Sequence, residues 1–208
     1  MAASFSTETA PGARRGRPAA ASREDVLAAA MHRYLRGQRI DVQAIAAELG
    51  LGRTTIYRWF GSREGLIGEV LNLAYDGLVE AACAEAKGRG GARLLDIFDR
   101  LNRSLADAPA LRQFVEAERE TALRIITSSG GSAQPHNVAR IVSVIEDEVR
   151  AGNYDPPVDP GTLGYAIVRL AEAFLFNDAA ADMRGDVDRL RDVEAAILGV
   201  KPPGQSAR

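Results

Sequence analysis

The sequence predicts an all-α fold, with a small N-terminal domain and a larger helical bundle behind it. Aromatic residues make up only 6% of the 208 residues while Ala and Leu are frequent, and this composition favours helix over sheet. Apolar residues recur at three- and four-residue spacing in one segment after another, and no strand of alternating pattern stands out. With 46% apolar residues, a chain of this length can bury a sizeable core.

The composition excludes several classes of protein. The longest apolar stretch, around 165–176, is broken by Arg169 and Glu172, so we predict no membrane span. Residues 1–18 lack the apolar run of a signal peptide. The single Cys83 rules out an intrachain disulfide and a cysteine-based zinc site. We therefore expect a cytoplasmic protein with no membrane partner, no metal and no cofactor.

The net charge of −2 hides an uneven distribution of charge along the chain. Residues 1–68 hold ten Arg against six acids, a net of +4, and the remainder holds 16 Lys and Arg against 22 acids, a net of −6. A basic first third joined to an acidic remainder indicates two parts with different partners, one of them a polyanion. Chance segregation of solvated charge is the alternative.

Three helices are predicted in the basic part. Ser22 is a good N-cap for a first helix, which Gly37 ends. Asp41 caps a short second helix, and Gly50 supplies the positive φ of the tight turn that follows it. A third short helix is expected over residues 53–60.

The remainder of the chain is predicted to be helical as well. A much longer helix opens at Ser62 and runs towards Ala86, and the sequence GRGG at 88–91 interrupts the chain. Beyond it we expect helices at about 92–106, 109–128, 136–151, 160–180 and 186–198.

The second and third helices, joined by a turn that contains Gly, have the pattern of a helix-turn-helix. In this motif the first helix holds the second rigidly, so that side chains at the start of the second reach base edges. Arg53, Thr54 and Thr55 stand there, and Arg suits guanine O6 and N7 while Thr suits a thymine methyl or a phosphate. The candidate phosphate contacts on the same helix are Tyr57, Arg58 and Trp59. An ordinary αα-hairpin is the structural alternative.

The run DVQAIAAELGLGRTTIYRWFGSREGLIGEVL resembles the DNA-binding region of TetR-type transcriptional regulators. The shared features are a small-residue positioning helix, a Gly-Leu-Gly turn, the pattern Thr-Ile-Tyr-Arg-Trp-Phe, and Gly-Ser-basic-Glu-x-Leu at the start of the fourth helix. The resemblance covers about residues 14–71 and implies DNA-backbone contacts for Tyr57, Trp59 and Arg63. Two positions depart from the pattern: Arg63 stands where Lys is commoner, and Gly52 stands where Ser or Thr often caps the recognition helix.

Arg14, Arg15 and Arg17 resemble the basic N-terminal arm of many such regulators. Flexible Arg-rich arms suit the narrow minor groove or nearby phosphates. A solvated tail that only aids solubility is the alternative.

The resemblance implies a fold of the TetR type with three parts: a flexible basic arm at 1–22, a helix-turn-helix domain at 23–68, and an effector-binding and dimerisation domain at 69–208. It also implies a homodimer whose two recognition helices read a palindromic operator in double-stranded DNA. We expect the helices at 160–180 and 186–198 to pair with their mates in the dimer.

The second part offers candidate contacts to a small-molecule effector. Arg169 and Glu172 lie one turn apart and can pair, and a buried guanidinium there offers donors to a lactone or carboxyl oxygen. A surface or interface ion pair is the alternative. The segment YAIVRLAEAFLFNDAAA is similar to the C-terminal domain of regulators of quorum-quenching lactonase operons, which implies an acyl-lactone or fatty-acyl effector. The candidate ligand contacts are Phe98, Phe114, Tyr165, Arg169, Glu172 and Phe176.

These observations together predict a ligand-responsive repressor that a small apolar or lactone-like effector releases from its operator. No catalytic constellation and no Gly-rich phosphate loop after a strand is present in the sequence, which disfavours a helical enzyme. An effector-independent architectural DNA-binding protein is the other alternative. Against it, the C-terminal 140 residues look too large for dimerisation alone.

Overall fold

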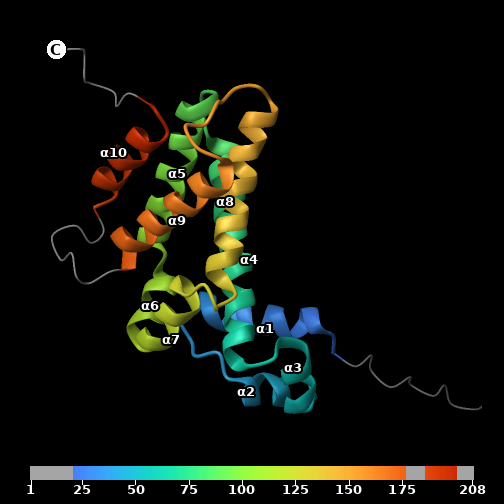
Figure 1. The fold of residues 1–208 in the computed structure, drawn as a ribbon. Coiled ribbons are helices and arrows are strands. Elements are labelled where there is room, and N and C mark those ends of the chain that lie inside the picture. The colour runs from blue at the N-terminus through green and yellow to red at the C-terminus, as the bar shows by residue number, and fades with distance from the viewer. Residues whose placement is uncertain (1–20, 177–185, 201–208) are drawn as a thin grey trace, which may run out of the picture.

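The computed structural model of the chain describes residues 21–176 and 186–200. Within them it confirms the all-α prediction, with ten helices and no strand (Figure 1). The helices are α1 (Arg23–Leu35), α2 (Val42–Glu48), α3 (Arg53–Phe60), α4 (Arg63–Glu85), α5 (Gly90–Asp107), α6 (Pro109–Ala117), α7 (Arg119–Thr127), α8 (Ala133–Arg150), α9 (Pro160–Phe176) and α10 (Val187–Ile197). The predicted arm at 14–17 and the last turn of the helix expected at 160–180 lie outside the described residues.

Side-chain caps determine where the N-terminal helices begin. Ser22 Oγ accepts a hydrogen bond from the Asp25 N–H, and the Asp25 carboxylate accepts one from the Ser22 N–H, which completes a capping box at α1. The Asp41 carboxylate accepts from two backbone N–H groups at the start of α2, and Ser62 Oγ accepts from one at the start of α4. The predicted starts of these helices are therefore confirmed, together with the chemistry behind them.

The helix predicted over 109–128 is instead two helices, because the chain leaves the helical conformation at Glu118. Its φ and ψ are −137° and 49°, which end α6 and redirect the chain into α7. Neither Gly nor Pro stands at this position, so the sequence carries no ordinary signal of a break. The break allows the Glu118 side chain to reach the start of α4, as described below.

Two hydrophobic cores share the long helix α4. The first core joins α1, α2, α3, α6, α7 and the first half of α4, which contributes the fully buried Leu66, Ile67 and Val70. The second core joins α5, α8, α9, α10 and the second half of α4, to which Val79 contributes. In Figure 1 the first three helices lie at the lower end, α5 and α8–α10 form the upper bundle, and α6 and α7 lie beside the junction.

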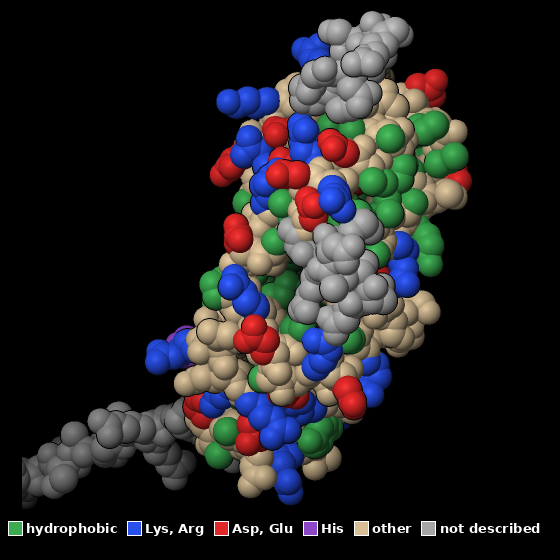
Figure 2. Space-filling view, turned by 90° about the vertical axis from the view of Figure 1, so that its left-hand side faces the viewer, with side chains coloured by type: hydrophobic (Ala, Val, Ile, Leu, Met, Phe, Trp, Pro, Cys, Tyr) green, Lys and Arg blue, Asp and Glu red, His purple; other side chains and the backbone are tan. Residues whose placement is uncertain are grey.

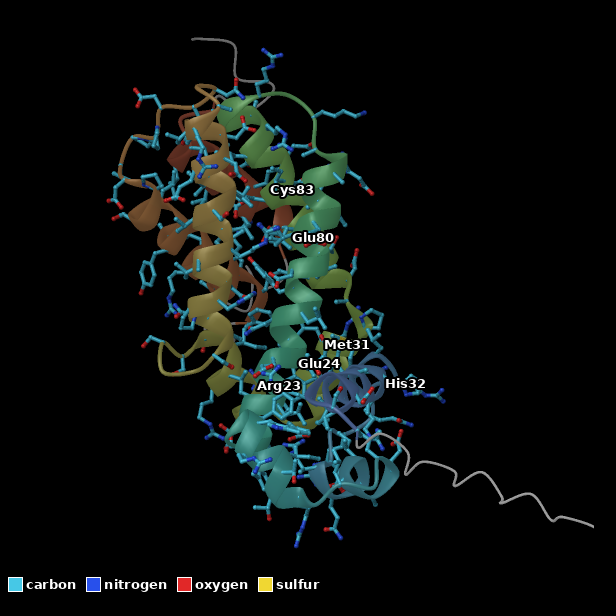
Figure 3. The ribbon with its side chains drawn as sticks, turned by 90° about the vertical axis from the view of Figure 1, so that its right-hand side faces the viewer. Arg23, Glu24, Met31, His32, Glu80 and Cys83 are labelled. Carbon is cyan, nitrogen blue, oxygen red and sulfur yellow. The ribbon has the colours of Figure 1, made fainter. Side chains whose placement is uncertain are left out.

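Polar contacts also hold the N-terminal helices together. The Arg23 guanidinium of α1 donates to the Glu69 carboxylate of α4 at 2.5 Å, and its carbon lies 4.6 Å from the centre of the Phe60 ring of α3. This cation–π contact and ion pair join three helices at one residue. Figure 3 shows Arg23 beside α4. Arg23 thus attaches α1 and α3 to α4.

Candidate DNA interface and ligand cavity

The α2–α3 turn fixes the direction in which α3 leaves the domain. Gly50 has a φ of +65°, and the Leu51 N–H donates to the Ala46 carbonyl at 2.9 Å to close the turn. Ile45 of α2 and Ile56 of α3 are fully buried, so each helix is held by its apolar side. The opposite side of α3 is left facing solvent.

Four of the six side chains nominated on α3 are exposed: Arg53, Thr54, Tyr57 and Arg58. Neither Arg53 nor Arg58 pairs with an acid among the described residues, so both guanidinium groups are available to an external anion. Thr55 and Trp59 are half-buried, and Trp59 packs against the first core, which fixes its ring. Gly52 forms no side-chain cap at α3, as its chemistry dictates. Figure 2 shows Lys and Arg side chains, with some acids, at the lower end that carries α2 and α3.

Arg63 was expected to contact the DNA backbone, but its guanidinium is engaged within the protein. Its Nε donates to the Ile40 carbonyl at 2.7 Å, and its two terminal nitrogens donate to the two Glu118 carboxylate oxygens at 2.7 and 2.6 Å. These hydrogen bonds hold the pKa of the Glu118 carboxyl below its usual value. The physical reason is the break at Glu118, which brings a carboxylate to the first turn of α4.

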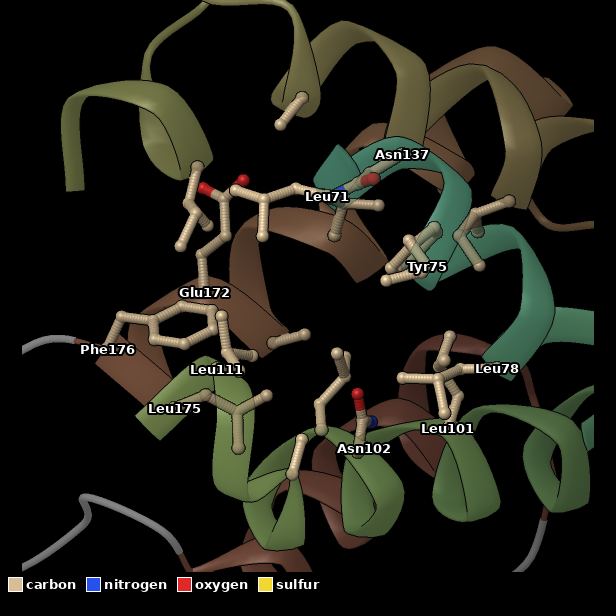
Figure 4. A pocket seen from close by; sticks show the side chains of 18 of the residues that line it. Leu71, Tyr75, Leu78, Leu101, Asn102, Leu111, Asn137, Glu172, Leu175 and Phe176 are labelled. Atoms are coloured by element: carbon tan, nitrogen blue, oxygen red, sulfur yellow. The ribbon is translucent and has the colours of Figure 1, made fainter. Parts of the chain in front are cut away.

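A cavity of about 80 Å³ lies in the C-terminal part, where α4, α5, α8 and α9 face one another (Figure 4). Its walls are mostly apolar, and helices α1, α6 and α7 each contribute a residue to them. Of the six nominated ligand contacts, Phe98, Glu172 and Phe176 line this cavity. Its other polar side chains are the tyrosines of α1 and α4 and two asparagines, Asn102 and Asn137.

The other three nominated residues lie away from this cavity. Phe114 packs against the first core and lines a separate hollow between α1 and α6. Tyr165 is 52% exposed on the outside of α9. The Arg169 side chain is 43% exposed, and one terminal nitrogen donates to the Thr127 carbonyl at 3.0 Å and to Glu172 Oε2 at 2.6 Å.

The i, i+3 spacing explains why Glu172 is buried while Arg169 is not. Positions three apart on an α-helix differ by about 60° around its axis. One residue of such a pair can therefore be buried while the other is exposed. Glu172 is 7% exposed and forms part of the cavity wall, whereas the Arg169 guanidinium approaches it from outside. The Arg169 guanidinium is therefore not buried and does not line this cavity, and its contact with a ligand stays a prediction.

Two buried carboxyl groups have perturbed titration. Burial raises the pKa of Glu172 to about 7, although its ion pair with Arg169 opposes the shift. Burial also raises the pKa of Glu194 in α10 to about 8, while a hydrogen bond from Asn102 opposes it. Asn102 Nδ2 donates to Glu194 Oε1 at 3.0 Å, and Glu194 is fully buried.

The family is decided by a match over the C-terminal part. Residues 89–199, more than half of the chain, match the family model described as the tetracyclin repressor-like C-terminal domain. The chain belongs to the TetR family. The prediction made from the motif at residues 14–71 is thereby confirmed by an independent segment.

Solved structures of TetR-family repressors have the same fold as this regulator. The repressor QsdR of R. erythropolis superposes with a TM-score of 0.80 at 28% identity, over 88% of this chain and 97% of that one. The repressor AlkX of Dietzia sp. strain DQ12-45-1b, described as implicated in the biodegradation of n-alkanes, gives a TM-score of 0.53 at 20% identity, over 89% and 100%. A comparison with curated protein sequences finds no match.

Three polar residues of this TetR-family regulator were missed by sequence reasoning: Asn102, Asn137 and Glu194. Each interrupts the apolar pattern of its helix, which is the signal that could have identified them. No group of three His, Cys, Asp or Glu side chains in the described ranges is placed to hold a metal ion. None of the helices seen in those ranges has the length and apolar character needed to cross a bilayer.

Proposed function

We propose that this chain is a homodimeric repressor in the cytoplasm that binds a palindromic operator and releases it when a small apolar effector enters the cavity. One observation carries the proposal: Tyr34 of α1 lines the cavity and also belongs to the core of the helix-turn-helix part. A molecule in the cavity would therefore touch the DNA-binding part directly.

Helices α6 and α7 supply a second connection between the cavity and the DNA-binding part. Leu111 of α6 and Ile126 of α7 line the cavity, and α6 packs against α1 while α7 packs against α4. Gly37 lies so close to Gln113 of α6 that a Cβ there would come within 1.6 Å of the Gln113 Oε1 atom. Movement of α6 would therefore press on the turn that follows α1.

The size of the cavity indicates how an effector would act. Its volume of about 80 Å³ is well below the roughly 300–1,000 Å³ of ordinary ligand pockets. Any drug-sized molecule must therefore move the walls, and α6 and α7 are part of them. An effector that binds the expanded state more tightly than the compact state shifts the population towards the expanded state. Release from DNA requires such a difference in affinity between the two states.

For DNA recognition, the proposal places α3 in the major groove with Arg53 and Thr54 at base edges and Tyr57 and Arg58 at phosphates. These four side chains are exposed at one end of the molecule. Two such helices in a dimer would read half-sites about 34–36 Å apart, or a multiple of that distance. Arg63 is left out of this interface because its donors are engaged with Glu118.

The surface of α8 and α9 is the dimer interface that we propose. Figure 2 shows hydrophobic side chains gathered on one side of the upper bundle. In Figure 1 this side faces the viewer, and α8 and α9 lie on it. On these two helices Tyr165 and Ala139 are exposed, and Val142 and Ala166 are half-buried. Helix α10, expected to take part, uses its buried residues against α5 and α9, so α8 replaces it in the proposal.

The dimer is tested by the substitution Tyr165→Arg, which places a charge on the proposed interface. We expect light scattering to give a dimer for the unmodified chain and a monomer for this variant. Leu73→Arg is the matched control, because Leu73 is 51% exposed on α4, outside the proposed interface. Loss of the dimer in the control alone would place the interface on α4.

The DNA function is tested by selecting bound sequences from a random duplex pool with the purified full chain. We expect the selected sequences to share a palindrome, and effector binding to reduce the affinity for it. Binding without sequence preference would instead favour the architectural DNA-binding alternative.

A further inference from the structure

The charge of the cavity wall restricts the ligands it can accept. Among the described residues that line it, Glu172 is the one acid, and no Lys, Arg or His is present. The remaining polar groups are the side chains of two tyrosines and two asparagines. The described wall therefore has one group that can be negative, and no positive charge that could bind an anionic ligand.

Two acceptor atoms at the cavity lack a hydrogen-bond donor. Glu172 Oε1 and Asn137 Oδ1 are buried and have no partner. Figure 4 shows the two side chains on the same side of the pocket, with Leu71 between them in that view. A buried acceptor without a donor costs free energy, and such groups in native proteins usually find a partner in water or in a ligand.

Two donors near the wall, on Arg169 and Asn102, are already in use, and the tyrosine hydroxyls of the wall are neutral donors. The Arg169 guanidinium serves Glu172 Oε2 from an outer hollow, which it lines together with Arg119. The Asn102 amide donates to Glu194. One oxygen of Glu172 therefore meets the Arg169 guanidinium on the outer side, while the other oxygen has no donor. Burial raises the pKa of this carboxyl to about 7.

We propose that the effector is a lipophilic amine, whose protonated amino group donates to Glu172 Oε1 and Asn137 Oδ1 while its apolar part occupies the cavity. This inference rests on the proposed function and specifies its ligand class. An ammonium carries up to three donors and forms charge-assisted hydrogen bonds to a carboxylate. The aromatic rings of Tyr75 and Phe98 in the wall offer further favourable contacts to a cation.

The same arrangement disfavours the two ligand classes inferred from sequence. A lactone has only acceptor oxygens, so it supplies no donor to Asn137 Oδ1, and none to Glu172 Oε1 while that carboxyl is ionised. A fatty acid in its ionised form would bring a second carboxylate towards Glu172 with no cation in the described wall to offset it. Arg169, which was expected to serve such ligands, lies on the outer side.

The test compares four eight-carbon probes by calorimetry on the full-length protein: n-octylamine, 1-octanol, γ-octalactone and octanoate. We expect the amine to bind about tenfold or more tightly than the others, as a charge-assisted hydrogen bond requires. Glu172→Gln should weaken amine binding by about tenfold and leave octanol and lactone binding nearly unchanged. Glu80→Gln is the control, since Glu80 is exposed on α4 (Figure 3).

A second variant protects the test against misfolding of the first. Asn137→Leu replaces one of the acceptors that lack a donor with an apolar side chain of similar size. This variant should also have a reduced preference for the amine. Thermal unfolding of each variant verifies that it is folded. Lactone or octanoate affinity equal to that of the amine, unchanged amine affinity in Glu172→Gln, or no amine binding at all would overturn the proposed ligand class.

Operator binding separates this inference from the proposed function. If γ-octalactone releases the selected operator and n-octylamine does not, the ligand class is wrong and the repressor function stands. If the protein selects no operator, the repressor function fails, and the calorimetric ranking of the probes still decides the ligand class.

Discussion

Arg63 and Glu118 form a two-point ion pair, with nitrogen–oxygen distances of 2.7 and 2.6 Å, between the first turn of α4 and the break that separates α6 from α7. The same guanidinium donates to the carbonyl of Ile40, which lies just before α2. One side chain thus ties the helix-turn-helix, α4 and the α6–α7 junction together. Because both partners are largely buried, at 23% and 16% exposure, solvent screens the pair only partly.

Removing this pair should loosen the junction and leave phosphate contacts intact. We expect Arg63→Ala to lower the free energy of unfolding by about 1.5–3 kcal/mol, because it strips a charged group of its hydrogen bonds. A double-mutant cycle with Glu118→Gln should give a coupling free energy of roughly 1 kcal/mol or more. Chemical denaturation of the two single variants and the double variant measures it. Strict additivity would show that the pair does not stabilise the fold.

The salt dependence of operator affinity distinguishes Arg63 from a true phosphate contact. Arg58→Ala should reduce the slope of log affinity against log salt by about one, whereas Arg63→Ala should leave the slope unchanged. The measurement is a salt titration of operator binding for both variants. A slope reduced by about one in Arg63→Ala would return this residue to the DNA interface.

Arg53 should govern sequence preference at one operator position. We expect Arg53→Ala to weaken binding to the selected operator by about 1–3 kcal/mol and to relax the preference for one base pair. Competition assays with single-base variants of the operator measure both effects. Arg150→Ala at the exposed end of α8 is the control and should change neither. Unchanged affinity and preference in Arg53→Ala would contradict the placement of α3 in the major groove.

Filling the cavity should stabilise the empty protein and exclude ligands. Ala171 lines the cavity, so Ala171→Val should raise the free energy of unfolding by about 1 kcal/mol and weaken the binding of every eight-carbon probe. Ala173→Val is a matched control on the same helix, because Ala173 is exposed. Thermal denaturation and calorimetry supply the two readouts. Full probe affinity in Ala171→Val would mean that these ligands bind elsewhere.

The buried Glu194 should make stability fall as pH rises. Burial raises its pKa from 4.5 to about 8, so between these values the folded protein holds a proton that the unfolded chain has released. The free energy of unfolding should therefore decrease with increasing pH across that window, by up to about 1.4 kcal/mol per pH unit from this group.

The substitution Glu194→Gln isolates this contribution, since Gln resembles the protonated acid and does not titrate. We expect denaturation between pH 5 and about pH 8 to show a shallower decline for this variant than for the unmodified chain. Glu80→Gln, which alters an exposed acid, should keep the original slope. An identical slope in Glu194→Gln would mean that the folded protein ionises this carboxyl as readily as the unfolded chain does.

Local chemistry explains why much of the fold could be predicted from sequence. Ser22, Asp41 and Ser62 cap helices through their own side chains, and Gly50 adopts the positive φ that its turn requires. Each of these signals lies within a few residues of the structure it determines. The exposed side of α3 followed in the same way from the apolar spacing of Ile56 and its neighbours.

The features that escaped prediction depend on contacts distant in sequence. Asn102 and Glu194 form a buried hydrogen bond although 92 residues separate them. The chain breaks at Glu118 where its side chain meets Arg63, 55 residues away, and no local signal marks the place. Helical periodicity identified the apolar side of α9 but could not show how far neighbouring helices cover it. That coverage determines which of Arg169 and Glu172 faces the cavity.

The length of α4 makes small rotations consequential. Its 23 residues extend about 35 Å, since each residue of an α-helix rises about 1.5 Å along the axis. A rotation of roughly 5° about the end in the second core would displace the other end by about 3 Å, close to the 3.4 Å that separates successive nucleotides of one DNA strand. If α3 lies in the major groove as proposed, a tilt of this size would move it out of step with the operator by about one base pair.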